Sequence, residues 1–340
     1  MEEKSKTASE KPKKKDPREK LLKPNGKPLI LKSSPHLLSN YSVEKIMRGV
    51  LFALLPTTIL GVVFFGWRAL LMILVGIISC VLTEVIFNLI SGKKFKLTDG
   101  TSVLTGLLLV LTLPPSFPIS GVILGSVVAI FIGKMIFGGL GYNIFNPALL
   151  GRAFLQASYP VKMTTWTLPK FVGADAVTGA TPLGLFKFEH VLTNIKPLIL
   201  GNVGGSIGET SAIAIILGGI FILIKKYADW RIPLSYIGTV FILGGIFWLI
   251  DPVQHPNPIF HVFAGGLMLG AFFMATDMVT SPITNKGSWI FGIGAGVVLI
   301  TIRLFGGLPE GVMYSIIFMN GLVPLINRYT QPKVFGEIKK

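Results

Sequence analysis

The chain has 340 residues, of which 51% are hydrophobic and only 14% are charged. Soluble domains carry about 25% charged residues, so most of this chain must be solvated by lipid or by its own side chains. Its net charge of +16 is unevenly distributed, and residues 1–48 alone hold 13 Lys and Arg against six Asp and Glu. This composition excludes an ordinary soluble domain and indicates an all-α polytopic membrane protein.

The basic amino-terminal segment contains no long apolar run, which excludes a cleaved signal peptide. One interpretation of such a charge run is a nucleic-acid-binding arm. The positive-inside rule offers a simpler one, a disordered cytoplasmic tail. We therefore expect a tail over residues 1–40, a membrane domain over 41–330 and a second cytoplasmic tail over 331–340, with no nucleic-acid partner.

Ten apolar segments are long enough to span, or nearly span, a bilayer. If the basic tail is cytoplasmic, the lysine-containing loops after the second, sixth and eighth segments also fall inside, as does the carboxyl terminus. This agreement with the positive-inside rule favours ten transmembrane segments with both termini cytoplasmic. The segments are 46–65, 68–90, 101–113, 119–138, 144–158, 209–224, 232–250, 258–276, 288–305 and 311–327.

Two of these segments are short. Segment 101–113 ends at a double proline, and segment 144–158 contains Pro147 and Arg152. Thirteen to fifteen helical residues cover about 20–23 Å, less than the ~30 Å hydrocarbon core. Broken or re-entrant helices are tolerated where protein or a cavity satisfies the freed backbone groups, so we predict broken helices here rather than kinked spans.

The two halves of the chain carry a faint internal repeat. Gly138-Gly139-Leu140 and Asn146 in the first half resemble Gly306-Gly307-Leu308 and Asn320 in the second, although the spacings differ. With five segments in each half, a duplication places the halves in opposite orientations. Inverted repeats of this kind build midplane sites between broken helices in transporters. We therefore predict two inverted five-helix repeats with a path or pocket inside the fold.

Metal and disulfide chemistry have little support in the sequence. Cys80 is the single cysteine, which excludes an intrachain disulfide and an iron–sulfur cluster ligated by this chain alone. His255 and His261 have no companion Cys or carboxylate at metal-ligand spacing, so we favour an interfacial role for them. We expect no metal site and a structural role for Cys80.

Ionisable residues near or inside the bilayer are functional suspects by default. Glu84 is the deepest carboxylate and is open to three interpretations: a cation ligand, a proton carrier or a partner for Lys134. Lys134 and Arg303 either pair structurally or extend to the membrane surface. Asp277 lies at the inner end of the eighth segment, and none of the four stands out as an ion site.

Two further motifs precede predicted helices. Asp99 and Thr101 suit helix capping as well as a cofactor contact. The glycine-rich run Gly201–Gly208 precedes the sixth segment, where free N–H groups are able to face a phosphate. It lacks the dinucleotide-binding spacing and follows no predicted strand, so a plain turn is favoured.

The topology places residues 159–208 in a long loop on the outer face, and long loops are usually functional or disordered. This loop contains the heptad Asp175-Ala-Val-Thr178-Gly-Ala-Thr181. Two hydroxyls flank small residues that allow close approach by another molecule. From the residues alone, the heptad is either an ordinary polar turn or a segment that presents a threonine for covalent modification.

Taken together, these motifs make the chain, from about residue 35 onward, resemble the RnfD/NqrB family of membrane subunits, and within it the Rnf branch. The heptad is the most specific element, since it matches the recognition sequence of flavin transferases. The motifs that carry the resemblance are Thr98-Asp-Gly-Thr-Ser-Val-Leu-Thr-Gly106, Asn143-Ile-Phe-Asn-Pro147, Asp175-Ala-Val-Thr-Gly-Ala-Thr-Pro-Leu183, Gly205-Ser-Ile-Gly-Glu-Thr-Ser211 and Ala275-Thr-Asp-Met-Val-Thr-Ser-Pro282.

The resemblance implies that Thr181 carries FMN through a phosphoester bond. Asp175, Thr178, Gly179 and Ala180 then form the recognised segment, with Thr178 in place of the commoner serine. Attachment needs an exposed acceptor hydroxyl with small neighbours, which we expect the outer loop to supply. Riboflavin is a further candidate cofactor.

The resemblance also implies a function: electron relay in a complex that couples ferredoxin oxidation and NAD reduction to Na⁺ or H⁺ movement in the bacterial inner membrane. The protein is not catalytic alone. The implied partners are other Rnf subunits, including a second covalent-FMN subunit, membrane cluster subunits and an NAD-site subunit. A flavin transferase is needed for maturation, and membrane lipid surrounds the chain.

Two alternatives stay open at this stage. One is a component of the Na⁺-translocating NADH:quinone reductase, a relative with a longer amino-terminal region. The other is a passive solute channel or permease, which inverted five-helix repeats suit equally well. Covalent flavin separates the channel from both redox proteins.

Overall fold

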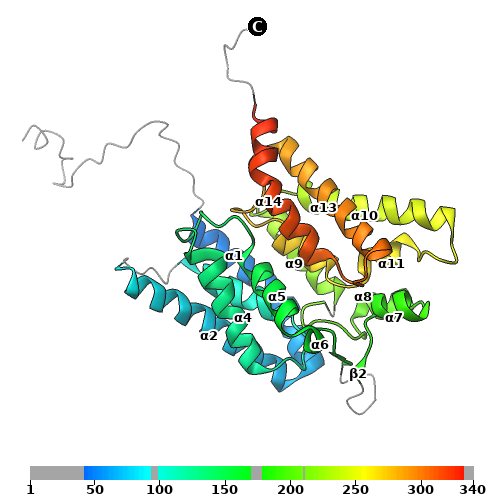
Figure 1. The fold of residues 1–340 in the computed structure, drawn as a ribbon, viewed down its shortest axis with the longest axis horizontal. Helices are drawn as coiled ribbons and strands as arrows, with labels where there is room; N and C mark the ends of the chain where they lie inside the picture. Colours follow the sequence, from blue (N-terminus) through cyan, green and yellow to red (C-terminus); the bar gives the residue numbers. More distant parts are fainter. Residues whose placement is uncertain (1–41, 93–98, 170–177, 210, 333–340) are drawn as a thin grey trace, which may run out of the picture. The chain divides into compact units, whose positions relative to one another are not determined.

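The structure is a computed structural model that describes residues 42–92, 99–169, 178–209 and 211–332. The predicted tail at 1–40, most of the tail at 331–340, and Asp175 lie outside these ranges. Within them the chain is helical apart from connecting loops and one short strand pair (Figure 1).

The elements follow the order of the predicted segments. The first half contains α1 (Val43–Phe65), α2 (Trp67–Ile90), α3 (Thr101–Leu111), α4 (Ile119–Ile130) with the π-helical η3 (Phe131–Met135), and α5 (Pro147–Ser158). The long loop contains α6 (Pro160–Met163), β1 (Trp166–Thr167), β2 (Thr178–Gly179), α7 (Pro182–Glu189) and α8 (Ile195–Leu200). The second half contains α9 (Ala212–Ile224), α10 (Arg231–Ile250), α11 (Pro258–Phe263), α12 (Leu267–Leu269), the π-helical η5 (Gly270–Met274), α13 (Asn285–Phe305) and α14 (Val312–Thr330).

Each of the ten predicted segments is occupied by a helix or a broken helix whose outer ends agree with the prediction within three residues. Four helices, α1, α2, α10 and α13, are long and apolar enough to cross a membrane by length and composition. Shorter apolar helices are α3, α9 and the continuous α4–η3. The polytopic all-α class is therefore confirmed, and the ten-span count remains a prediction.

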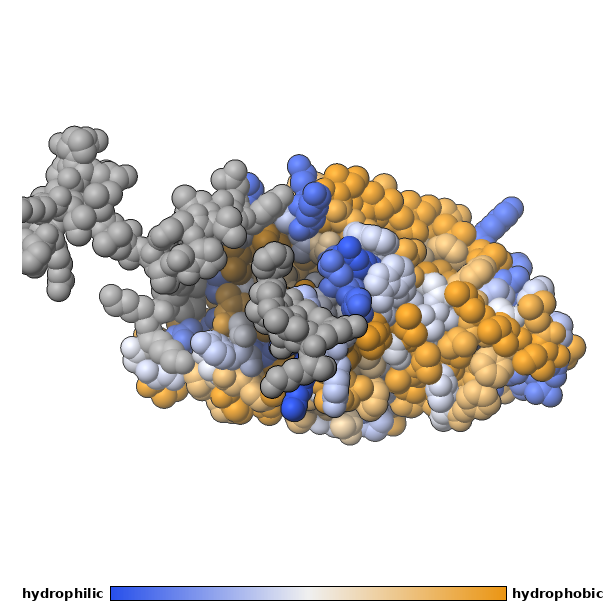
Figure 2. Space-filling view, turned by 90° about the horizontal axis from the view of Figure 1, so that it is seen from above, coloured by the Kyte–Doolittle hydropathy of each residue, from blue (hydrophilic) through white to orange (hydrophobic). Residues whose placement is uncertain are grey.

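Apolar side chains cover much of the surface, as Figure 2 shows for one face. On α2, Leu89 is 71% exposed and Ile90 is 80% exposed, and on α10 Leu249 is 74% exposed. Patches of this kind are rare on soluble monomers and are stabilised where lipid replaces water. The surface thus agrees with the membrane assignment.

Helices of both halves share a single hydrophobic core. In the second half α10, α13 and α14 pack side by side (Figure 1). In the first half α2 packs on α3 and α4, and the halves meet where α1 contacts α9 and α5 contacts α14. The contact between α2 and α3 is a backbone contact, because a Cβ on Gly106 would lie 2.8 Å from the Gly76 oxygen.

Helix α3 is short, as the length of its segment predicted, whereas the other short segment, 144–158, contains a single continuous helix, α5. Helix α3 ends at Leu111, and the end of the long loop, next to α9 of the second half, supplies donors for carbonyl groups at and just after this end. The Gly208 N–H donates to the Leu111 oxygen at 2.7 Å and the Ile207 N–H donates to the Leu113 oxygen at 3.1 Å. Helix ends leave unsatisfied carbonyls that cannot stay bare in a membrane. The two halves are therefore joined by backbone hydrogen bonds at this break.

A second break, within the eighth segment, was not predicted. The helix stops at Phe263 and restarts at Leu267, with Gly265 at a φ of 70°. The Arg303 guanidinium donates to the His261 and Ala264 oxygens, the latter at 2.9 Å, at the end of α11. Glu310 accepts a hydrogen bond of 3.1 Å from the Gly266 N–H before α12 begins. Opposite charges thus satisfy the two helix ends created by the break.

Candidate functional site

Thr181 lies at the start of α7 and caps that helix. Its hydroxyl oxygen accepts a hydrogen bond of 3.1 Å from the Gly184 N–H, and Pro182 occupies the first helical position, where its missing N–H costs nothing. The residue is only 7% exposed. The expectation of an exposed hydroxyl is therefore wrong for this conformation, because the threonine is used as a helix cap.

The small residues before Thr181 are held by a strand pair. Gly179 lies opposite Trp166, and Thr178 lies opposite Thr167, in an antiparallel pair. Ala180 is exposed. Four residues of the heptad, Thr178 to Thr181, are thus held between β1 and α7.

Lys187 holds α7 against the second half of the chain. Its ammonium donates to backbone oxygens of Arg303 at 3.0 Å and of Leu308 at 3.0 Å, and also to those of Ile302 and Gly306. These carbonyls lie at and beyond the end of α13, where positive charge is favoured. Burial lowers the pKa of Lys187. The lysine fixes the helix that carries Thr181.

A pocket of about 370 Å³ opens beside Thr181, and we call it the Thr181 pocket. Pockets for small organic ligands span about 300–1,000 Å³ and combine apolar walls with a few polar groups. Most of its walls are apolar or aromatic, and its charged side chains are Arg152 and Glu310. The other lining residues are Gln156, Met163, Thr164, Trp166, Ala180, Gly184, Phe188, Gly307, Leu308, Pro309, Val312, Met313 and Tyr314.

Arg152 faces a buried carboxylate without a hydrogen bond to it. Its side chain is 8% exposed, that of Glu209 is 6% exposed, and the Arg152 Nη1 and Glu209 Oε1 atoms are 4.0 Å apart. Among the parts of the chain that the structure describes, Arg152 Nε and Glu209 Oε1 have no hydrogen-bond partner. Arg152, Glu209 and Glu310 were not predicted as site residues, although Glu209 lies inside one of the recognised motifs.

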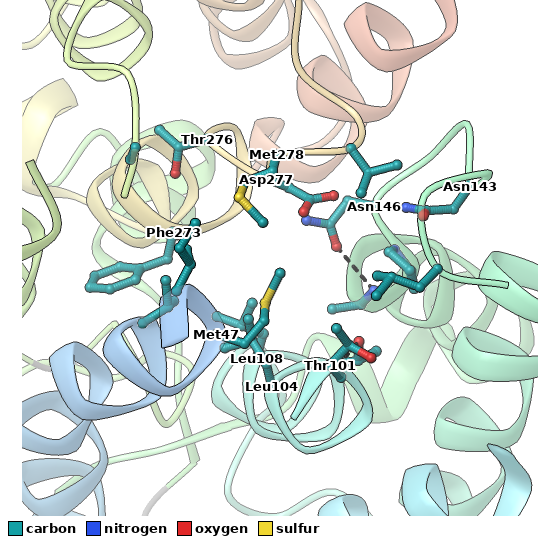
Figure 3. Close-up of a pocket in the computed structure, with 18 of the residues that line it drawn as sticks. Met47, Thr101, Leu104, Leu108, Asn143, Asn146, Phe273, Thr276, Asp277 and Met278 are labelled. Atoms are coloured by element: carbon teal, nitrogen blue, oxygen red, sulfur yellow. Dashed lines mark hydrogen bonds between the residues drawn. The ribbon is translucent and has the colours of Figure 1, made fainter. Parts of the chain in front are cut away.

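A smaller pocket of about 70 Å³ lies between α3, the start of α5 and the loop after η5 (Figure 3). Asn146 and Asp277 lie on one side of it, with Met47 and Leu104 opposite. Asn146 caps α5 through the Ala148 N–H at 3.0 Å, and its amide donates to the Met274 oxygen at 3.1 Å. We call this the Asn146–Asp277 pocket, and its volume suits waters or an ion rather than an organic ligand.

The internal repeat brings its two asparagines together. With the Asn320 amide oriented to satisfy its neighbours, its oxygen accepts from the Asn146 N–H at 3.1 Å and its nitrogen donates to the Thr280 oxygen at 3.1 Å. Asn146 belongs to the first half and Asn320 to the second. The repeated residue is thus a contact between the halves.

Glu84 is a partner for Lys134, one of the three interpretations that the sequence left open. The Lys134 ammonium donates to both carboxylate oxygens, at 2.8 and 2.9 Å, and to the Thr101 hydroxyl at 2.6 Å. Asp99 accepts from the Thr101 N–H at 3.2 Å, which confirms the capping interpretation. These contacts join α2, α3 and η3 in the apolar core.

The other suspect residues have structural settings. The N–H groups of Ile207 and Gly208 are used on α3, so this part of the glycine-rich run does not present them to a phosphate. His261 is buried, and no group of three or more metal-ligating side chains occurs within the described ranges. Asp277 accepts a hydrogen bond of 3.0 Å from the Thr280 hydroxyl.

An apolar surface, a helix break closed by Arg303 and Glu310, and a ligand-sized pocket beside a loop threonine define a polytopic α-helical membrane protein with an internal polar site. The sequence profile of the NQR2, RnfD, RnfE family matches residues 30–336. The chain belongs to this family.

Three relatives illustrate the similarity. The chain is 49% identical to the D subunit of the proton-translocating ferredoxin:NAD(+) oxidoreductase complex of Clostridium ljungdahlii, over 90% of this chain and 96% of the relative. It is 42% identical to the D subunit of the Na(+)-translocating ferredoxin:NAD(+) oxidoreductase complex of Acetobacterium woodii, over 92% and 96%. It is 36% identical to the D subunit of the ion-translocating oxidoreductase complex of Escherichia coli, over 90% and 98%. One relative is named as proton-translocating and another as Na(+)-translocating, so the similarity does not identify a translocated ion.

Proposed function

We propose that this chain is an electron-transfer subunit of an ion-translocating ferredoxin:NAD oxidoreductase complex and carries FMN covalently on Thr181. The observation that carries the proposal is the Thr181 pocket, a ligand-sized space beside the last threonine of a flavin-transferase heptad. The type of complex, with ferredoxin as electron donor and NAD as acceptor, is inferred from the names of the relatives.

The residues around Thr181 fit a flavin. The volume of about 370 Å³ lies within the range of cofactor sites, and Trp166, Phe188 and Met313 offer apolar contacts for a flat ring. Arg152 offers a buried positive charge. A flavin supplies the redox chemistry, and the protein supplies its position and electrostatic surroundings.

The burial of Thr181 adds a condition to the attachment step. A transferase cannot reach a hydroxyl that caps α7 and is 7% exposed. The modification therefore requires that α7 has not yet docked or that it opens locally, and Lys187 is the contact that opposes opening. Because Thr181 lines the Thr181 pocket, a flavin attached to it would be held there.

The electrons must be exchanged with other subunits. Within the residues that the structure covers, no cluster of metal-ligating side chains is present, so an iron–sulfur centre has to come from a partner. The proposed partners are the cluster subunits, the NAD-site subunit and a second covalent-FMN subunit, with a flavin transferase for maturation. The proposed topology has ten transmembrane segments in the inner membrane, with the flavin-bearing loop on the outer face.

Riboflavin remains a prediction as an additional cofactor. The Asn146–Asp277 pocket, at about 70 Å³, has no room for a flavin in this conformation. A second flavin would need an open form of that pocket or a surface shared with another subunit.

The test is flavin fluorescence of the denatured protein band after co-expression with a flavin transferase. The wild type and Thr181→Ser should fluoresce, and Thr181→Ala should be dark. Thr181→Asn is the sharper variant, because asparagine caps a helix as well as threonine does but has no hydroxyl to esterify. It should fold and stay dark, whereas Thr178→Ala should keep some fluorescence at Thr181.

The outcomes separate the alternatives. Fluorescence in Thr181→Asn would reject Thr181 as the attachment site. A dark wild type, with the transferase shown to be active on another substrate, would favour the channel or permease. If the chain carries covalent flavin but its native complex accepts no electrons from ferredoxin, the quinone reductase alternative would be favoured.

A further inference from the structure

We propose that Arg152 is the positive charge that faces the flavin in the Thr181 pocket and sets its redox potential. The inference rests on the proposed function, since it assumes that the pocket holds the flavin attached at Thr181. It assigns a role to a residue on α5, far from the heptad in the sequence.

The position of Arg152 is fixed by close helix packing. The preceding residue, Gly151, meets α4 so closely that a Cβ there would lie 2.8 Å from the Gly125 oxygen and 2.8 Å from the Ala129 Cβ. The α5 backbone therefore cannot rotate or withdraw without losing this contact. From this fixed backbone Arg152 lines the Thr181 pocket together with Thr181 itself.

A comparison with Arg303 shows what Arg152 lacks. Both side chains are more than nine-tenths buried. Arg303 donates to two backbone carbonyls and lies 3.4 Å from Glu310. Arg152 has no such hydrogen bond within the described ranges, and its nearest carboxylate oxygen, on Glu209, is 4.0 Å away and is itself without a partner.

A buried guanidinium whose Nε–H has no acceptor among the described residues, beside an open pocket, indicates a ligand that accepts hydrogen bonds or carries negative charge. The pocket's other charge, Glu310, is already engaged by Arg303 and the Gly266 N–H. Glu209 compensates Arg152 only at a distance. Arg152, whose ion pair with Glu209 contains no hydrogen bond, is therefore the lining cation with a donor left for the ligand.

A flavin gains negative charge when it is reduced. If it takes up two electrons and one proton, its charge falls by one, and a nearby positive charge stabilises the reduced form over the oxidised form. Arginine stays protonated at any accessible pH, and a site with few waters screens its field weakly. Arg152 should therefore raise the potential of the flavin.

The experiment uses the purified complex, or the flavin-loaded protein co-expressed with a flavin transferase, in detergent. Flavin content is measured by fluorescence of the denatured band. The midpoint potential is measured by spectroelectrochemical titration, with dithionite as the reductant whose oxidation balances flavin reduction. The variants are Arg152→Gln, Arg152→Lys and Glu310→Gln, and Arg68→Gln is the matched control because Arg68 does not line the pocket.

The expected result is unchanged flavin content with a shift of the midpoint potential to more negative values in Arg152→Gln. Arg152→Lys should restore most of the wild-type potential, Glu310→Gln should shift it in the positive direction, and Arg68→Gln should leave it unchanged. A wild-type potential in a fully flavinylated Arg152→Gln would overturn the inference. Should that variant fail to assemble, a wild-type potential in a flavinylated Arg152→Met would overturn it instead.

Flavin content distinguishes this failure from failure of the proposed function. A wild-type chain without covalent flavin rejects the proposed function, and the inference falls with it. If the wild type is flavinylated but its midpoint potential is the same as in the Arg152 and Glu310 variants, only the role of Arg152 is rejected.

Discussion

Lys134 and Glu84 form a buried ion pair in which one ammonium donates to both carboxylate oxygens, at 2.8 and 2.9 Å. The Lys134 side chain is 3% exposed and that of Glu84 is 9% exposed. The third donor of the ammonium is used on Thr101, so the pair has no free hydrogen for another acceptor. Lys134 therefore neutralises the Glu84 carboxylate inside the apolar core.

Breaking this pair from one side should be costly. Glu84→Gln or Lys134→Met leaves a buried group without its partner, which costs about 3–5 kcal/mol of stability. The double variant Glu84→Leu/Lys134→Met removes both charges and should recover much of that loss. Thermal unfolding in detergent checks the cycle, and a double variant as unstable as the sum of the single ones would contradict it.

Arg303→Met should destabilise the break between α11 and α12. The substitution leaves the His261 and Ala264 carbonyls without their donor, at about 1–3 kcal/mol for each unpaired group. Arg48→Met is the matched control, because Arg48 is 68% exposed and pairs with Glu44 on the surface of α1. A surface pair contributes only about 0–1 kcal/mol, so the control should melt near the wild-type temperature. Equal melting temperatures for the two variants would argue against the capping role.

Gly106→Ala should separate α3 from α2. An added Cβ would meet the Gly76 oxygen and the Ile77 Cα at 2.8 Å each, and such overpacking costs about 1–3 kcal/mol. For Gly238→Ala, on α10, we expect the opposite effect, an increase in stability. No atom lies within 4 Å of the new Cβ, so the helix should gain about 0.5–1 kcal/mol. Opposite shifts of the unfolding temperature are the expected pair of results, and shifts of the same sign would refute the close contact.

Lys187→Met should loosen α7. The ammonium serves several carbonyls near the end of α13, and hydrogen bonds to charged groups contribute about 1.5–3 kcal/mol. We expect faster proteolysis within the 159–208 loop and, with a flavin transferase present, faster labelling of Thr181. Lys196→Met, at an exposed position on α8, should change neither rate. Unchanged protection in Lys187→Met would show that other contacts dock α7.

The helices were predictable because lipid imposes a simple rule on apolar runs. All ten segments, including the short helix α3, follow from runs that must satisfy their backbone internally. The break at Gly265 was missed, because the residues that close it, Arg303 and Glu310, lie far along the chain. Its stability depends on tertiary contacts that no local pattern contains.

The candidate site was only partly predictable. Thr181 was identified through the resemblance of its heptad, whereas its burial follows from capping α7, an element that the sequence analysis did not predict. The Glu84–Lys134 pair was among the alternatives considered. The pairing of Arg152 with Glu209 was not, because the whole loop 159–208 separates the two residues in the sequence.

The hydrogen bonds from Ile207 and Gly208 to the end of α3 have a consequence for biosynthesis. During translation the first five helices enter the membrane while the donors for Leu111 and Leu113 are still unmade. Until residues 207 and 208 have been made and have packed on the end of α3, these carbonyl groups need another partner, such as water or the insertion machinery. The first half therefore cannot complete its hydrogen bonding until the later residues are made. A chain truncated after α5 should be degraded rather than accumulate as a stable fragment.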